Sequence, residues 1–227
     1  MQSTKLLNQS SVNTSTLNQP VIPMNFRQYI VAITFTVLSL QALGGSLEDG
    51  QDLYNKEKYA DALAAFKHAA DEGNVQAFFI LGAMHENGDG VEKNYAQAMT
   101  WYMKAAEHGD AAAQSNIGTL YENGQGVTKD FEKATAWYLK AAESGNQQAQ
   151  SNLGVAYFKG QGVAIDKVEA YKWIFLAESG GNLDAKIKRE YLEGFLNDAQ
   201  KSEAKQRANE WLQAWMKRMN AIKPGQN

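Results

Sequence analysis

Cysteine is absent from the 227 residues, and proline is rare, with three. A chain without cysteine has no disulfide framework, no cysteine-ligated zinc or iron–sulfur site and no thiol nucleophile. The 22 basic residues are slightly outnumbered by 25 acidic ones, for a formal net charge of −3. This balance argues against a nucleic-acid surface, which needs clustered Lys and Arg to neutralise phosphates. Three prolines beside 19 glycines favour long helices that end at glycine.

One long apolar run, from Tyr29 to Leu43, lies in the first part of the chain and carries no charge. It is short for a bilayer span, which needs about 20 residues, and has the length of the apolar region of a signal peptide. The small residues up to Gly44 resemble a signal-peptidase site. Counted from Met24, the segment before the run is short and basic through Arg27, so we expect translation to begin there.

These features predict an exported protein, periplasmic or secreted, whose signal peptide is cleaved. The alternative is an uncleaved run that anchors the chain in the inner membrane. Residues 1–44 hold Lys5 and Arg27 and no acidic residue, so cleavage leaves 20 basic against 25 acidic side chains. An exported chain without cysteine must hold together by packing alone.

Residues of the same type recur every 36 positions from residue 73 onward. The recurring residues are three sets of glycines and one set of tryptophans: Gly73, Gly109 and Gly145; Gly82, Gly118 and Gly154; Gly88, Gly124 and Gly160; Trp101, Trp137 and Trp173. Self-similarity with a period of 20–50 residues is typical of solenoid proteins.

Each period predicts two helices, which we call helix A and helix B. Side-chain oxygens that can cap free backbone N–H groups precede both, at Asn74, Asp110 and Asn146 for helix A and at Asn94, Asp130 and Asp166 for helix B. Glu169, three residues after Asp166, is expected to complete a capping box. Glycine inside helix A, as at Gly118, costs about 1 kcal/mol, and its recurrence predicts close contact between helices A and B.

The residues of each period follow the pattern A-x-x-x-L-G-x-x-Y-x-x-G-x-G-V-x-x-D-x-x-x-A-x-x-W-Y-x-K-A-A-x-x-G, which resembles the Sel1-like repeat, a relative of the tetratricopeptide repeat. The second period, from Ala113 to Gly145, reproduces nearly all of it. The other periods depart from the pattern at His85, Asn94, Ile174, Leu176 and Glu178.

The resemblance implies an all-α fold, an α/α solenoid of antiparallel helix pairs with capping helices at both ends. The expected N-terminal segments are a non-native or disordered extension at residues 1–23, a signal peptide at 24–44 and a tetratricopeptide-like capping pair at 45–72. Three Sel1-like repeats follow at 73–108, 109–144 and 145–181, and C-terminal capping helices at 182–227. The last predicted helix has one apolar face, made of Ala204, Ala208, Trp211, Leu212, Trp215 and Met219. The alternative for this helix is binding to a membrane surface.

Enzyme motifs are incomplete. His85-Glu86 begins like the zinc-binding H-E-x-x-H, but Asp89 stands where the second histidine is needed, so His85 is expected to pack where other copies have tyrosine. Ser202 and Lys205 match S-x-x-K without the partner motifs of penicillin-binding proteins. The helix B tryptophans are read as core residues rather than stacking platforms for ligands. We therefore predict no catalytic residue, no metal and no cofactor.

Stacked helix pairs curve, and helices A line the concave side. Candidate binding residues are the helix A side chains outside the core phase: Phe79, Glu86, Ser115, Asn116, Thr119, Glu122, Ser151, Asn152, Val155 and Phe158. Asn116 and Asn152 recur one period apart, and an amide can both donate to and accept from a peptide backbone.

The resemblance implies a non-catalytic adaptor or scaffold that binds a protein or peptide partner, without nucleic acid, and meets a membrane only through an uncleaved signal sequence. One alternative is a cell-envelope enzyme or enzyme subunit acting on or regulating cell-wall metabolism, which predicts a carboxylate pair or a serine–lysine dyad in one pocket. Another is a structural oligomer that stacks end to end through an incomplete terminal unit.

Overall fold

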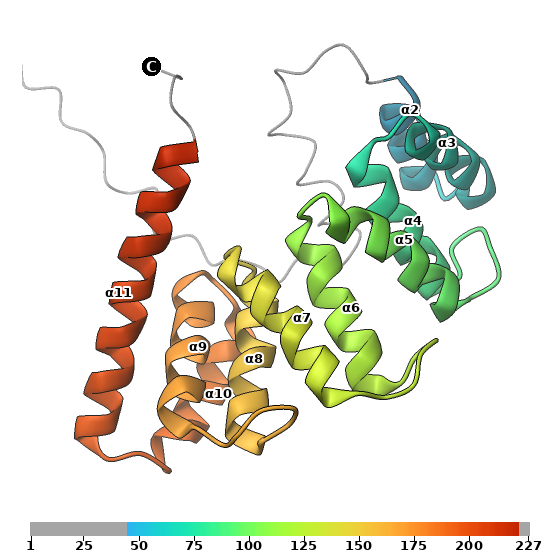
Figure 1. The fold of residues 1–227 in the computed structure, drawn as a ribbon. Coiled ribbons are helices and arrows are strands. Elements are labelled where there is room, and N and C mark those ends of the chain that lie inside the picture. The colour runs from blue at the N-terminus through green and yellow to red at the C-terminus, as the bar shows by residue number, and fades with distance from the viewer. Residues whose placement is uncertain (1–44, 223–227) are drawn as a thin grey trace, which may run out of the picture.

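The computed structural model describes residues 45–222, which form ten α-helices (Figure 1). Their bounds are α2 Gly45–Asn55, α3 Tyr59–Asp71, α4 Val75–Asn87, α5 Tyr95–Glu107, α6 Ala111–Asn123, α7 Phe131–Glu143, α8 Gln147–Lys159, α9 Lys167–Ser179, α10 Leu183–Glu193 and α11 Asp198–Ile222. The predicted signal peptide and N-terminal extension lie outside the described residues. Within that part of the chain, no helix is both long enough and apolar enough to cross a membrane.

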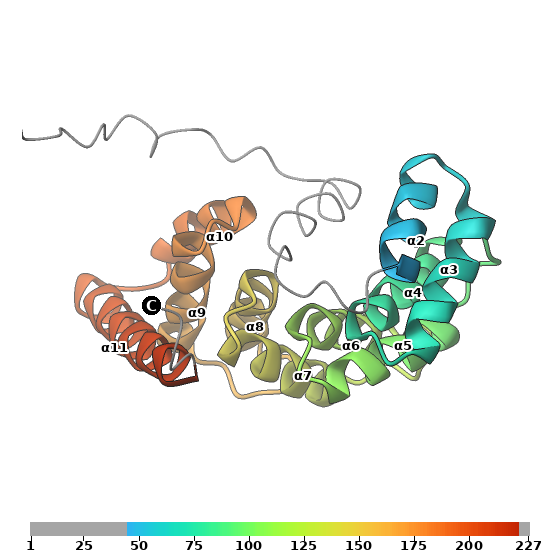
Figure 2. The same ribbon diagram turned by 90° about the horizontal axis from the view of Figure 1, so that it is seen from above.

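The helices pack as consecutive antiparallel pairs, which confirms the all-α solenoid. In each repeat the tightest partner of helix A is the helix B that follows it, and helix B then packs on the next helix A. Figure 2 shows the result as an arc, with the A helices α6, α8 and α10 on its inner side and the B helices α5 and α7 on its outer side.

The predicted helix starts are confirmed at all six capping positions. Asn74, Asp110 and Asn146 accept a hydrogen bond from the backbone N–H three residues later, at 2.7–3.1 Å. The three helix B caps do the same at 2.9–3.0 Å. Each cap satisfies a backbone donor that the helix itself leaves free, so the start of every helix in the repeats is set locally.

The capping box predicted at Asp166 and Glu169 is wrong in its second half. Asp166 caps the helix, but its own N–H donates to the carbonyl of Tyr157 at 3.1 Å and leaves nothing for Glu169 to accept. The Glu169 carboxylate instead pairs with Lys172 and with Arg207 of α11, both at 2.9 Å.

The predicted close contact between helices A and B is confirmed at the recurring helix A glycine. A Cβ atom at Gly82 or Gly118 would lie 2.5–2.6 Å from the ring of Tyr102 or Tyr138 on the paired helix. At Gly154 it would lie 2.5 Å from Ile174. Only glycine allows the helices to approach this closely, which offsets its low helix propensity.

The last two helices differ in how they join the solenoid. Asn182 caps α10 through the N–H of Ala185 at 3.0 Å, one period after Asn146, so α10 occupies the place of a fourth helix A. The following helix, α11, packs mainly on α9, with the Trp211 and Trp173 rings 5.5 Å apart edge to face. Ala204 and Ala208 are fully buried there, which confirms the predicted apolar face.

Gly118→Ala is expected to lower the free energy of unfolding by about 1–2 kcal/mol, because the added methyl group would collide with the Tyr138 ring. Urea unfolding followed by circular dichroism measures the change. At an open helix position the same substitution would stabilise by about 1 kcal/mol. A stabilised variant would therefore contradict the packing of α6 on α7.

Candidate binding site on the inner face

The inner face is the exposed side of the A helices, and eight side chains define it here. They are half-buried and come from α4, α6, α8 and α10: Glu86, Asn116, Thr119, Glu122, Asn152, Val155, Phe158 and Lys188. Seven of them were predicted from the sequence, and Lys188 was not.

Two tyrosines of the B helices reach the inner face and hold carboxylates there. The Tyr102 hydroxyl donates to Glu86 at 2.7 Å, and the Tyr138 hydroxyl donates to Glu122 at 2.6 Å. Burial, and then interaction with the neighbouring carboxylate, raise the pKa of both phenols well above the usual value. Each tyrosine therefore stays protonated and keeps its carboxylate in one place on the inner face.

An asparagine of the next helix A completes each of these groups. The side chain of Asn116 lies beside the Tyr102 hydroxyl, and that of Asn152 beside the Tyr138 hydroxyl; both amides act to lower the phenol pKa, against the effect of burial. Tyrosine, glutamate and asparagine thus form one polar unit between successive A helices. This unit occurs twice, between α4 and α6 and between α6 and α8.

The third repeat replaces both members of the tyrosine–glutamate pair. Ile174 occupies the tyrosine position and Phe158 the glutamate position. The Phe158 ring packs edge to face against Tyr191 and Phe195, with centroids 5.9 and 5.1 Å apart. The carboxylates of the inner face therefore lie on α4 and α6, whereas α8 carries the Phe158 ring, which packs on Tyr191 of α10. Because the tyrosine and the glutamate are replaced in the same repeat, the sequence alone could have indicated that they act as a pair.

Lys188 of α10 lies at the same position of the period as Asn116 and Asn152. Its Nζ donates to the Ser151 hydroxyl at 2.7 Å, and burial lowers the pKa of this amine, while the charges of Asp184 and Glu122 oppose that shift. Counting 36 residues on from Asn152 would have found it. The prediction missed it because residues after 181 were assigned to a cap outside the period.

Ser151 and Lys188 form the kind of pair that the enzyme alternative predicts, but the serine is inaccessible. Ser151 is completely buried in the middle of α8, beneath α10. A nucleophilic serine needs room for a carbonyl substrate and free N–H donors beside it, whereas the N–H groups around Ser151 belong to the helix. The pair instead attaches α10 to α8 and holds the ammonium group on the inner face.

Three predicted site residues offer almost no surface to a partner, and for them the expected exposure is wrong. Phe79 is buried, with its ring centroid 5.7 Å from that of Tyr102. Ser115 and Ser151 are buried because this side of each helix A faces the next helix A. Phe79 is therefore not available to a partner, whereas Phe158 is half-buried on the inner face.

Each helix B tryptophan has the ammonium group of a lysine above its ring. Lys104, Lys140 and Lys172 place Nζ 4.1–4.4 Å from the centroids of Trp101, Trp137 and Trp173, respectively. Trp173 is buried, and the Trp101 ring stacks on Phe78, so both contribute to packing as predicted.

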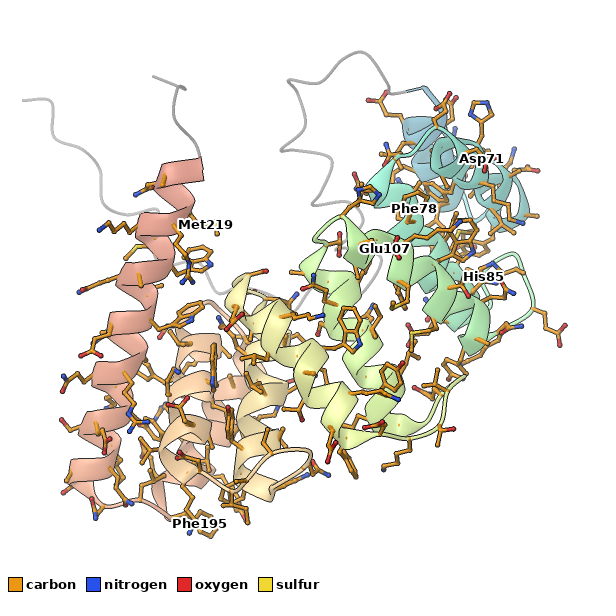
Figure 3. The ribbon with its side chains drawn as sticks, viewed as in Figure 1. Asp71, Phe78, His85, Glu107, Phe195 and Met219 are labelled. Atoms are coloured by element: carbon orange, nitrogen blue, oxygen red, sulfur yellow. The ribbon has the colours of Figure 1, made fainter. Side chains whose placement is uncertain are left out.

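His85, on α4 (Figure 3), is buried as predicted. Its Nδ1 has no hydrogen-bond partner among the described residues. Burial, and then the charge of Lys67, lower the pKa of its imidazole. Across residues 45–222 no group of three His, Asp or Glu side chains has the arrangement of a metal site.

The comparisons with known proteins agree with this architecture. The Sel1 repeat matches residues 76–110, 111–146 and 147–182. A Sel1 repeat protein from Oxalobacter formigenes, known from its crystal structure, is 31% identical over 76% of this chain and 70% of its own, with a TM-score of 0.62. The chain belongs to the Sel1 repeat family.

Another similar structure is a protective antigen of uropathogenic Escherichia coli with an SLR fold. It is 26% identical, the match covers 89% of this Sel1 repeat chain and 53% of the antigen, and the TM-score is 0.48. No curated protein matches the chain. The Sel1 matches begin at residues 76, 111 and 147, within three residues of the predicted starts at 73, 109 and 145.

The bond between Tyr138 and Glu122 is expected to contribute about 1.5–3 kcal/mol, as for a hydrogen bond to a charged acceptor. A double-mutant cycle with Tyr138→Phe and Glu122→Ala, read by urea unfolding, measures the coupling. The matched control pairs Tyr138→Phe with Glu132→Ala, an exposed residue of α7, and should be additive within about 0.5 kcal/mol. Equal coupling in both cycles would argue against the specific bond.

His85→Tyr, which installs the residue of the other repeats, is expected to reduce the loss of stability on acidification. The folded pKa of His85 lies below 6.5, so the unfolded chain takes up this proton first and stability falls as pH drops below 6.5. Urea unfolding between about pH 7.5 and 5.5 should show a smaller decrease for the variant than for the wild type. Parallel decreases would show that His85 does not contribute.

Proposed function

We propose that this Sel1 repeat protein binds an extended segment of another protein on its inner face and acts as a non-catalytic adaptor. Sel1 repeats generally mediate protein interactions. The observation that carries the proposal is the row Asn116, Asn152 and Lys188, which lie at one position of the period on three successive A helices.

The chemistry of the row suits a peptide backbone. Each asparagine amide has a donor and an acceptor and lies beside a tyrosine hydroxyl, and Asn152 is also held by Gln148, whose Nε2 donates to its Oδ1 at 3.0 Å. A side chain already held in one rotamer loses little conformational entropy on binding. The half-buried positions also lie between helices, where water competes less well for the same hydrogen bonds.

The two ends of the inner face carry side chains of different charge. Glu86 and Glu122 lie on α4 and α6, whereas the Lys188 ammonium and the Phe158 ring lie toward α8 and α10. A segment with a basic side chain facing α4 and α6, and an acidic and an apolar group facing α8 and α10, fits this distribution. The polarity would fix the direction in which the segment binds.

We further propose that the protein acts outside the cytoplasm, in the periplasm or as a secreted protein, or anchored to the inner membrane if the apolar run from Tyr29 to Leu43 is retained. The apolar run and the small residues before Gly45 support export. The chain has no cysteine, so it has no thiol that an oxidising compartment could modify, and export is compatible with its composition.

The test compares the wild type with Asn116→Ala/Asn152→Ala in a crosslinking pull-down from the intact cell envelope. The double variant should lose the partners that the wild type recovers. A matched control, Asn209→Ala/Asn220→Ala, removes two exposed amides from α11 and should keep them.

A peptide from the recovered partner then gives the size of the effect. Two lost hydrogen bonds at about 1 kcal/mol each predict a dissociation constant raised at least tenfold for Asn116→Ala/Asn152→Ala. Equal affinities for both double variants would show that the inner face is not the binding site.

A further inference from the structure

An exposed apolar stripe runs along α10. Leu183, Ile187 and Tyr191 follow one another at intervals of four residues and are 51%, 70% and 62% exposed. Phe195, just beyond the helix end (Figure 3), is 43% exposed and packs against Tyr191. These are four of the six large apolar side chains that the described part of the chain exposes, so the apolar surface is concentrated at one end of the solenoid.

Ile187, in the middle of the stripe, lies on the side of α10 on which a further helix A would pack. One period earlier, the position of Ile187 is Ser151, and one period before that it is Ser115. Both serines are at most 3% exposed, because the next helix A covers them; in α8 the covering residue is Lys188 of α10. Nothing in residues 45–222 covers the equivalent side of α10, since α11 turns away to pack on α9.

The other end of the solenoid offers no apolar match for this stripe. Among the described residues of α2 and α3, no large apolar side chain is among the exposed ones, and the exposed positions are mostly charged or polar, including Glu48, Asp49, Asp61 and Lys67. Head-to-tail stacking would therefore bury the stripe against charged side chains. The alternative is that the stripe packs on the same stripe of a second copy, which gives a closed dimer with two-fold symmetry.

Charges on one edge of the stripe have this self-complementarity. Lys186 and Glu190 are one helical turn apart on the same edge, both are exposed, and neither makes an ion pair within the described residues. When two copies of α10 cross antiparallel about a point midway between them, Lys186 of each copy is level with Glu190 of the other. Ile187 of each copy then lies close to the axis, and Tyr191 lies one helical turn farther out.

We propose that α10 is a homodimerisation surface on which a second copy of this chain packs its own α10 antiparallel. Four side chains provide less than the roughly 1,600 Å² of a standard interface. The dimer is therefore expected to be concentration-dependent, with a dissociation constant in the micromolar range. It covers Tyr191, which packs on Phe158 of the inner face, and leaves the inner face on α4 and α6 open.

Sedimentation equilibrium of the full chain tests the surface. The wild type should rise from monomer to dimer mass with concentration, and Ile187→Glu/Tyr191→Glu should remain monomeric. Ile165→Glu, which removes an equally exposed apolar side chain between α8 and α9, should associate as the wild type does. A wild type that stays monomeric, or association that the α10 substitutions leave unchanged, would overturn the proposal.

Charge exchange tests the antiparallel geometry with folded proteins. Lys186→Glu and Glu190→Lys should each weaken association at least tenfold, because like charges then face each other twice. Mixing these two variants should restore a dimer of one copy of each, and the double exchange in one chain should restore the homodimer. Failure of both restorations would rule out self-pairing of α10 and point to a different occupant.

Discussion

The packing of a tyrosine ring on a helix A glycine connects the core of this protein to its binding face. At Gly118 the missing side chain lets the Tyr138 ring lie against the helix, and this contact sets the distance between α6 and α7. The ring is then placed so that its hydroxyl reaches the inner face and donates a hydrogen bond to Glu122 of α6. One contact therefore fixes both the spacing of the solenoid and the position of a carboxylate, and Gly82, Tyr102 and Glu86 repeat it.

The same geometry explains why the repeats differ in chemistry without differing in shape. Ile174 fills the space over Gly154 as tyrosine does elsewhere, but it has no hydroxyl to hold a carboxylate. Phe158 then replaces the glutamate and joins an aromatic cluster with Tyr191 and Phe195. Toward the C-terminal end the molecule thus becomes apolar on the inner face and on the free side of α10, while its core packing continues unchanged.

Most of the helix architecture was predictable because its determinants are local. A cap such as Asn146 acts on a backbone N–H three residues away, so its role can be read directly from the chain. The candidate site was only partly predictable. Ser151 lies on the side of α8 that the next helix A covers, and Lys188 was placed outside the period although it continues it. Glu169 has the spacing of a capping box, yet Arg207 from a distant helix binds it.

The period of 36, the start of each repeat helix, the glycine contacts and the family follow from the amino-acid sequence alone, since all of these depend on residues close together in the chain or repeated in phase. Which side chains are exposed depends instead on how the helices pack in three dimensions. The same helix position is buried at Ser115 and Ser151 and exposed at Ile187, because burial depends on whether another helix follows. That difference comes from α11, which packs on α9 and leaves the side of α10 beyond the last repeat uncovered.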